Sequence, residues 1–223
     1  MNHYVIALLW AIVGAAAGWG MRWASVKLAR LEELEPGNKR WQQFGPPILC
    51  ALLFAGFAFQ ITSFPVLVVR SVFVVVLVQV IFFDFEHHLI LDRVMFPSMA
   101  LALLLAIVGK PWWPGSAALF DKPWLDSIAT GIAAGLLFLL LAVIGAAIFK
   151  AEALGFGDVK LALFMGLLLG ELATISALFY GVLLAAVGAI AFIVVHRSLK
   201  GTIAYGPYLA AGALIMLFQL PLN

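Results

Sequence analysis

The chain has 223 residues, of which 65% are hydrophobic and 11% are charged, and its mean hydropathy is +1.13. Soluble domains carry about 25% charged residues, so this composition excludes a soluble globular protein and predicts an integral membrane protein with several spans. The net charge of +2 excludes the strongly basic surface typical of nucleic-acid binding. The single cysteine, Cys50, excludes an internal disulfide and a Cys-x-x-Cys metal site.

Apolar residues gather in eight segments that are too long and too continuous for the alternating strands of a barrel. The segments lie at about 4–21, 47–63, 65–83, 94–109, 127–149, 158–170, 172–195 and 206–220. We therefore expect an all-α fold of about eight transmembrane helices in a single integral membrane domain over 1–223. The sixth and eighth segments are shorter than an ordinary span of roughly 20 residues. The first lacks a basic n-region and a cleavage site, so it is predicted to be a retained span.

Lysine and arginine are distributed unequally between the two sides of the predicted bundle. One side carries ten of them: Arg22, Lys27, Arg30, Lys39, Arg40, Arg93, Lys150, Lys160, Arg197 and Lys200. The other side carries three: Arg70, Lys110 and Lys122. Because basic residues are enriched in cytoplasmic loops, the short loop over 22–46 is predicted to be cytoplasmic and both termini to face outward. Asp84 and Asp158 then lie on the same, cytoplasmic, side.

These two aspartates stand at the edges of strongly apolar segments, where a charge is expensive and usually functional. Asp84 ends one segment, and Asp158 closes the run Gly155-Phe156-Gly157-Asp158 and opens another. Gly155 and Gly157 permit unusual backbone angles and close approach of another chain. Two carboxylates on one membrane face predict a pair that shares a proton, which is acid–base machinery.

Each motif also has a plainer interpretation. Asp158 could serve only as the N-cap of a helix, with the glycines forming the turn before it. The loop from Asp84 to Arg93 could be an ordinary solvated loop, with Asp92 capping the next helix and pairing with Arg93. Adjacent His87 and His88 point in different directions and lack a matching set elsewhere, so no metal site is expected.

A third motif opens the last apolar segment on the same predicted face. The run is Tyr205-Gly206-Pro207-Tyr208-Leu209-Ala210. Gly206 and Pro207 predict a rigid turn into a helix, which is a sufficient structural role by itself.

Together, the three motifs resemble the prepilin peptidases, the type IV leader peptidases of the Gly-x-Gly-Asp class of intramembrane aspartyl proteases. The resemblance covers roughly residues 65–215 and implies that Asp84 and Asp158 are the catalytic pair. It implies removal of the short basic leader of prepilins or pseudopilins at the cytoplasmic face of the inner membrane, in type IV pilus or type II secretion systems. Gly155, Gly157, Glu86, Asp92, Gly206 and Pro207 are the residues expected to shape the site or bind substrate. No metal or cofactor is implied.

The chain departs from the family's pattern in three places. Glu86 stands where an aspartate is usual, and Leu91 stands where a proline is usual before the last acid of the loop. Bifunctional members carry two Cys-x-x-Cys pairs in a cytoplasmic insert and also N-methylate the product. With one cysteine and a short first loop, this chain is expected to be a peptidase alone.

The basic leader of such a substrate suggests that acidic side chains hold it, and Glu86, Asp92 and Glu152 are the candidates on the predicted cytoplasmic face. The expected partners are this substrate and membrane lipid, and no nucleic acid; the sequence leaves the oligomeric state open.

Two other classes of function are weighed against a peptidase. A proton-coupled transporter would carry acids near the bilayer midplane and repeat symmetry, which the sequence lacks. A non-catalytic scaffold would not need both aspartates.

Overall fold

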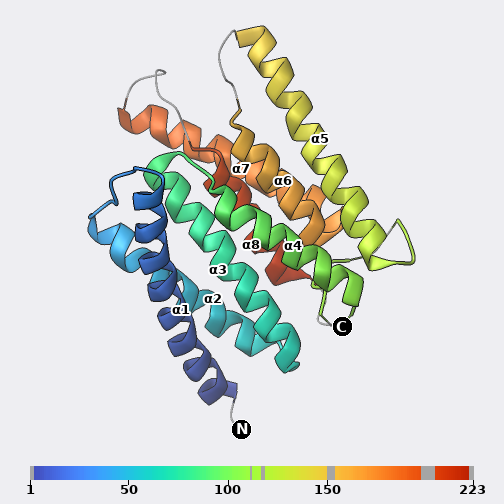
Figure 1. Ribbon diagram of the computed structural model, residues 1–223. Coiled ribbons are helices and arrows are strands. Elements are labelled where there is room, and N and C mark those ends of the chain that lie inside the picture. Colours follow the sequence, from blue (N-terminus) through green and yellow to red (C-terminus); the bar gives the residue numbers. More distant parts are fainter. Residues whose placement is uncertain (1–2, 111, 117–118, 150–153, 197–203, 221–223) are drawn as a thin grey trace. The chain divides into compact units, whose positions relative to one another are not determined.

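The computed structural model of the protein describes residues 3–110, 112–116, 119–149, 154–196 and 204–220. Within these ranges the regular structure consists of eight α-helices (Figure 1). They are α1 (His3–Leu31), α2 (Arg40–Gln60), α3 (Phe64–His87), α4 (Asp92–Val108), α5 (Pro123–Phe149), α6 (Phe156–Leu169), α7 (Glu171–His196) and α8 (Gly206–Gln219). The predicted all-α class is confirmed.

Five of the helices, α1, α2, α3, α5 and α7, are long and apolar enough to cross a membrane. The other three are shorter: α4 has 17 residues, and α6 and α8 have 14 each. These lengths agree with the short sixth and eighth segments of the sequence. The total of eight spans and the outward termini stay predictions.

The segment expected as a loop over 22–46 is mostly helical. Helix α1 continues to Leu31 and α2 already begins at Arg40, so the connector between them comprises only residues 32–39. The apolar pattern stops at Arg22, but a helix does not end where its residues become polar, and residues 22–31 contain neither proline nor glycine. The helix ends where the chain turns, with Glu33 at a φ of 59° and Pro36-Gly37 soon after.

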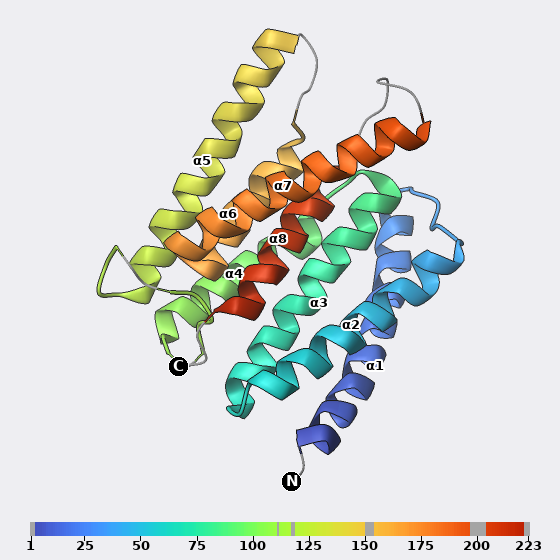
Figure 2. The same ribbon diagram turned by 180° about the vertical axis from the view of Figure 1, so that it is seen from behind.

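The chain divides into two compact units, one running from the N-terminus to His88 and the other spanning Leu89–Leu220. In the first unit, α1 packs against α2 and α3, and α2 also contacts α3. In the second unit, α6 contacts all four of its companions, α4, α5, α7 and α8, which surround it in both views (Figures 1 and 2). Most of its side chains are accordingly buried. The region that resembles the peptidases, 65–215, extends over both units.

Glycines set the closest helix contacts in each unit. A Cβ at Gly18 of α1 would lie 2.6 Å from Pro47 Cα of α2, and a Cβ at Gly166 of α6 would lie 2.6 Å from Gly131 Cα of α5. Small residues are favoured where membrane helices meet because they let the two backbones approach. Pro47 lies inside α2, and membrane helices accommodate proline when neighbouring helices pack closely on it.

We expect Gly18→Leu to destabilise the first unit by about 2 kcal/mol, because the added side chain must displace the backbone of α2. The matched control is Gly20→Leu in the same helix, where nothing lies within 4 Å of an added Cβ. Thermal unfolding in detergent micelles measures both. Equal losses for the two variants would contradict this account of the α1–α2 contact.

Candidate active site

Asp84 lies in the last turn of α3 and is only 5% exposed. Its backbone oxygen accepts a hydrogen bond from the N–H of His88 at 2.9 Å, and His88 ends the helix in the left-handed conformation with a φ of 52°. The carboxyl group is therefore held at the end of a strongly apolar helix and not in a flexible loop. A buried acid at such a boundary is a candidate functional group by default.

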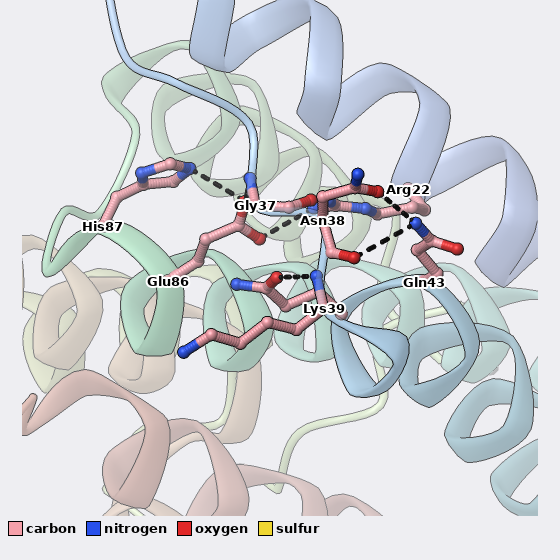
Figure 3. Close-up of polar contacts among 8 residues, drawn as sticks. Arg22, Gly37, Asn38, Lys39, Gln43, Glu86 and His87 are labelled. Carbon is pink, nitrogen blue, oxygen red and sulfur yellow. Dashed lines mark hydrogen bonds and ion pairs between the residues drawn. The ribbon is translucent and has the colours of Figure 1, made fainter.

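Glu86, two residues further along α3, has a carboxylate that is already engaged inside the first unit (Figure 3). Arg22 of α1 donates from Nη1 to Glu86 Oε2 at 2.7 Å, and the N–H of Gly37 donates to Oε1. His87 Nε2 lies 3.3 Å from Oε1, without hydrogen-bond geometry. The Glu86 side chain is 3% exposed, so the structure assigns it internal partners.

Asp158 stands in the first turn of α6, the central helix of the second unit, and is 8% exposed. The interpretation of Asp158 as an N-cap is wrong. Gly155 occupies the cap position with extended backbone, no side chain caps the helix, and the N–H of Asp158 donates to the backbone oxygen of Gly155 at 3.1 Å. An acid in the first turn is stabilised as its anion by the positive end of the helix dipole.

The two glycines before Asp158 serve different purposes, and neither requires a positive φ. Gly155 has a φ of −71° and is exposed; an added Cβ there would meet Asp158 Oδ2 at 3.6 Å, an ordinary contact distance. Gly157 lies inside α6, where an added Cβ would come within 3.0 Å of Ile90 Cβ. The close approach at Gly157 is to the chain's own Ile90, and the expected approach of another chain stays a prediction.

The Gly-Pro motif begins α8 as predicted, with Gly206 and Pro207 as its first two residues, both buried. Tyr205 precedes them and packs beside Phe138 of α5, with ring centroids 6.4 Å apart. Burial raises the pKa of the Tyr205 phenol, and the negative charge of Asp158 raises it further. The motif thus places the Tyr205 phenol close enough to Asp158 for the negative charge of the carboxylate to affect it.

Asp92 has a different role from the one predicted. Leu91 is the N-cap of α4, and Asp92 is the first residue of the helix. The Asp92 Oδ1 accepts a hydrogen bond from Nζ of Lys160, which lies two residues after Asp158. The two side chains form an ion pair, and the Asp92 side chain is 53% exposed. The predicted cap is therefore wrong, and Asp92 ties the start of α4 to the start of α6. Glu152 lies outside the described residues.

A further buried acid, Asp126, was not singled out from the sequence. It stands in the first turn of α5 and is fully buried. Its carboxylate oxygens accept the backbone N–H groups of Leu119 at 3.1 Å and Phe120 at 3.4 Å. These bonds give Asp126 a structural function, because they satisfy donors of the segment that precedes the helix.

The structure thus groups the predicted residues by unit. Asp84 and Glu86 belong to the first unit, whereas Asp158, Gly155, Gly157, Gly206 and Pro207 belong to the second, together with Asp92.

Sequence reasoning missed Arg22 as the partner of Glu86 and Lys160 as the partner of Asp92. Both were counted only as loop cations, and no local pattern reveals a partner 64 or 68 positions away. Tyr205 was visible as part of its motif, but its relation to Asp158 was not.

We expect the Tyr205 phenol to titrate above the usual tyrosine pKa of about 10. Asp158→Asn should lower this pKa only part of the way, because burial is the larger cause and remains. The measurement is a pH titration of ¹³C-labelled tyrosine rings by NMR in detergent, with Tyr205→Phe assigning the signal. Asp92→Asn removes an exposed carboxylate of the same unit and should leave the value unchanged. An unaltered pKa in Asp158→Asn would contradict the proximity of the two groups.

Comparison with known proteins identifies the family. The sequence model of the type IV leader peptidase family matches residues 71–193, a stretch that includes both Asp84 and Asp158. No curated protein and no solved structure matches the chain. Because the matched stretch covers more than half of the sequence and runs from α3 into α7, the chain belongs to the type IV leader peptidase family and is a peptidase with several apolar helices of membrane-spanning length.

Proposed function

We propose that the protein is an intramembrane aspartyl endopeptidase whose catalytic pair is Asp84 and Asp158. Its substrates would be type IV prepilins or pseudopilins, from which it removes the short basic leader at the cytoplasmic face of the membrane. The observation that carries the proposal is that the matched stretch contains two aspartates, each buried at the end of an apolar helix. The unequal distribution of lysine and arginine supports the cytoplasmic face.

The proposed chemistry is attack of water on a peptide carbonyl. Two neighbouring carboxylates do not both ionise readily, so the pair retains one proton. The ionised partner accepts a proton from water while the water oxygen bonds to the carbonyl carbon. The protonated partner donates a hydrogen bond to the carbonyl oxygen and then passes its proton to the leaving amine. The position of Asp158 in the first turn of α6 favours it as the ionised partner.

The surroundings of Asp158 suit a substrate backbone. A peptide bond must leave its helix before it can be cut, so the site needs room for an extended segment beside the carboxylate. Gly155 is exposed and has no side chain at the position where a Cβ would face Asp158 Oδ2. We infer that this open space receives the backbone next to the scissile bond.

Of the acids considered for binding the basic leader, Asp92 fits that role best. Its side chain is 53% exposed, so a substrate lysine or arginine can reach the carboxylate and replace Lys160, whose own side chain is 18% exposed. Both Glu86 oxygens, in contrast, are engaged with Arg22 and Gly37, so we assign Glu86 to shaping the site.

The decisive test is leader removal from a co-expressed prepilin-like substrate, followed as a mobility shift on a gel. Asp84→Asn and Asp158→Asn are each expected to abolish cleavage, lowering the rate by at least about 10⁴-fold, because each removes one proton carrier of the pair. Asp126→Asn is the matched control, since Asp126 is equally buried but serves a structural contact. Cleavage that survives either catalytic substitution refutes the aspartyl mechanism, and a chain inactive on every substrate favours a scaffold or transporter.

Gly155→Val is expected to lower kcat/KM about 10- to 100-fold with little change in thermal stability, because the side chain fills the space beside Asp158 while its backbone angles remain allowed. Gly157→Val should instead lower stability, because its Cβ would press against Ile90. Steady-state kinetics and melting curves on both variants separate the two effects. Full activity of Gly155→Val would show that substrate approaches elsewhere.

A further inference from the structure

Three elements of the first unit meet at the Glu86 carboxylate. Glu86 belongs to the end of α3, Arg22 to α1, and Gly37 to the 32–39 connector (Figure 3). The Arg22 guanidinium binds both of the others: Nη1 donates to Glu86 Oε2, and Nη2 donates to the backbone oxygen of Gly37. The Gly37 N–H closes the triangle by donating to Glu86 Oε1. Every contact in this group joins two different segments.

The connector is also fixed on its other side, toward the start of α2. The N–H of Lys39 donates to Gln42 Oε1 at 2.8 Å, and Gln43 Nε2 donates to Asn38 Oδ1 at 2.5 Å. An added Cβ at Gly37 would fall within 2.5 Å of the Gln42 side-chain amide. A side chain at Gly37 would therefore have to displace the Gln42 amide, whose Oε1 accepts the Lys39 N–H.

Burial makes the Arg22–Glu86 pair sensitive to the loss of either partner. The side chains are 13% and 3% exposed. A carboxylate removed from water depends on its partner, and loss of that partner leaves an uncompensated charge. Each oxygen of the Glu86 carboxylate accepts a hydrogen bond from another segment, and these two contacts hold its own helix turn in place.

That helix turn also carries Asp84. Residues two apart on an α-helix are separated by about 200° around its axis, so Asp84 and Glu86 project to nearly opposite sides. A carboxylate anchored on one side of the turn fixes the rotation of the other side. This anchor adds to the backbone cap at the end of α3, where the N–H of His88 satisfies the Asp84 carbonyl but the later carbonyl groups of the turn lack intrahelical partners.

We propose that Glu86 is a positioning residue which, clamped by Arg22 and the Gly37 N–H, docks the 32–39 connector on α3 and fixes the orientation of Asp84. This inference rests on the proposed function, because it assumes that Asp84 is catalytic. It differs from a leader-binding role for Glu86 in a measurable way. A positioning residue acts on kcat for every substrate, whereas a leader-binding residue acts on KM for basic leaders.

The first experiment is steady-state kinetics of Glu86→Gln on two substrates, one with a basic leader and one with its basic residues replaced by glutamine. We expect kcat to fall about 10- to 100-fold on both, as a small misplacement of a reacting group does, with KM unchanged within about twofold. Glu35→Gln makes the same chemical change at an exposed position of the same connector and should leave both constants unchanged. Unchanged kcat in Glu86→Gln, or a rise in KM confined to the basic leader, overturns the proposal.

A double-mutant cycle tests whether Arg22 acts through Glu86. Because both single substitutions break the same contact, Arg22→Gln with Glu86→Gln should lose no more kcat than either alone. Additive losses would overturn the clamp. Arg22→Lys is the milder variant if a charge deletion prevents folding: it keeps the charge, loses the fork that binds Glu86 and Gly37 together, and should still lower kcat.

Limited trypsin digestion supplies a readout that does not depend on catalysis. Loss of the clamp should speed cleavage after Lys39, the last residue of the connector, and after Arg40, the first residue of α2, whereas Glu35→Gln should not. An unchanged digestion rate in Glu86→Gln would show that the connector is held by other contacts. Asp84→Asn is assayed in parallel. If the Asp84→Asn variant still cleaves the substrate, the proposed function is wrong. If Asp84→Asn is inactive but Glu86→Gln is fully active, only the positioning role of Glu86 is wrong.

Discussion

Close approach of helix backbones at glycine is the constraint on which both units depend. In hydrocarbon, apolar side chains gain nothing by leaving lipid for a neighbouring helix, so helices associate where their shapes allow intimate contact. Gly18 provides that contact between α1 and α2, and Gly166 provides it between α6 and α5. The first contact fixes the pair of helices whose connector reaches Glu86. The second fixes the central helix that begins at the Gly-x-Gly-Asp motif, so the chemistry is positioned by packing some distance away.

Asp126, Glu86 and Asp92 all lie at helix ends, and the role of each follows from the partners that it has there. Two backbone N–H groups donate to the Asp126 carboxylate, and the Glu86 carboxylate is held by a guanidinium and one N–H. Asp92 keeps an exposed carboxylate beside Lys160. An acid with strong internal partners is a poor proton carrier, because its anion is already stabilised. Burial alone therefore does not identify a catalytic acid; burial has to be considered with the partners.

The fold class and the approximate location of every helix could be predicted because apolar content alone determines which segments can be helices in a membrane. Boundaries were less predictable, since α1 runs ten residues past its last apolar segment without a proline or glycine to stop it. The motif around Asp158 was visible, but its glycines were expected to supply unusual angles, and Gly155 has an ordinary φ of −71°. Partners such as Arg22 for Glu86 depend on tertiary packing, which a local sequence pattern does not encode.

Glu86 and Asp92 show how far such packing changes the meaning of a residue. In the sequence they are two acids of one short loop, and nothing local distinguishes their roles. In the structure one is enclosed by α1 and the connector, whereas the other stands at the surface at the beginning of α4. Breaking an ion pair that is held away from water carries a high energetic penalty, so Glu86 suits a structural role. An exposed carboxylate exchanges its partner readily, so Asp92 suits the binding of a substrate cation. The short connector contributes to this division, since the N–H of Gly37 and the Arg22 guanidinium of α1 both donate to the Glu86 carboxylate and hold it inside the first unit.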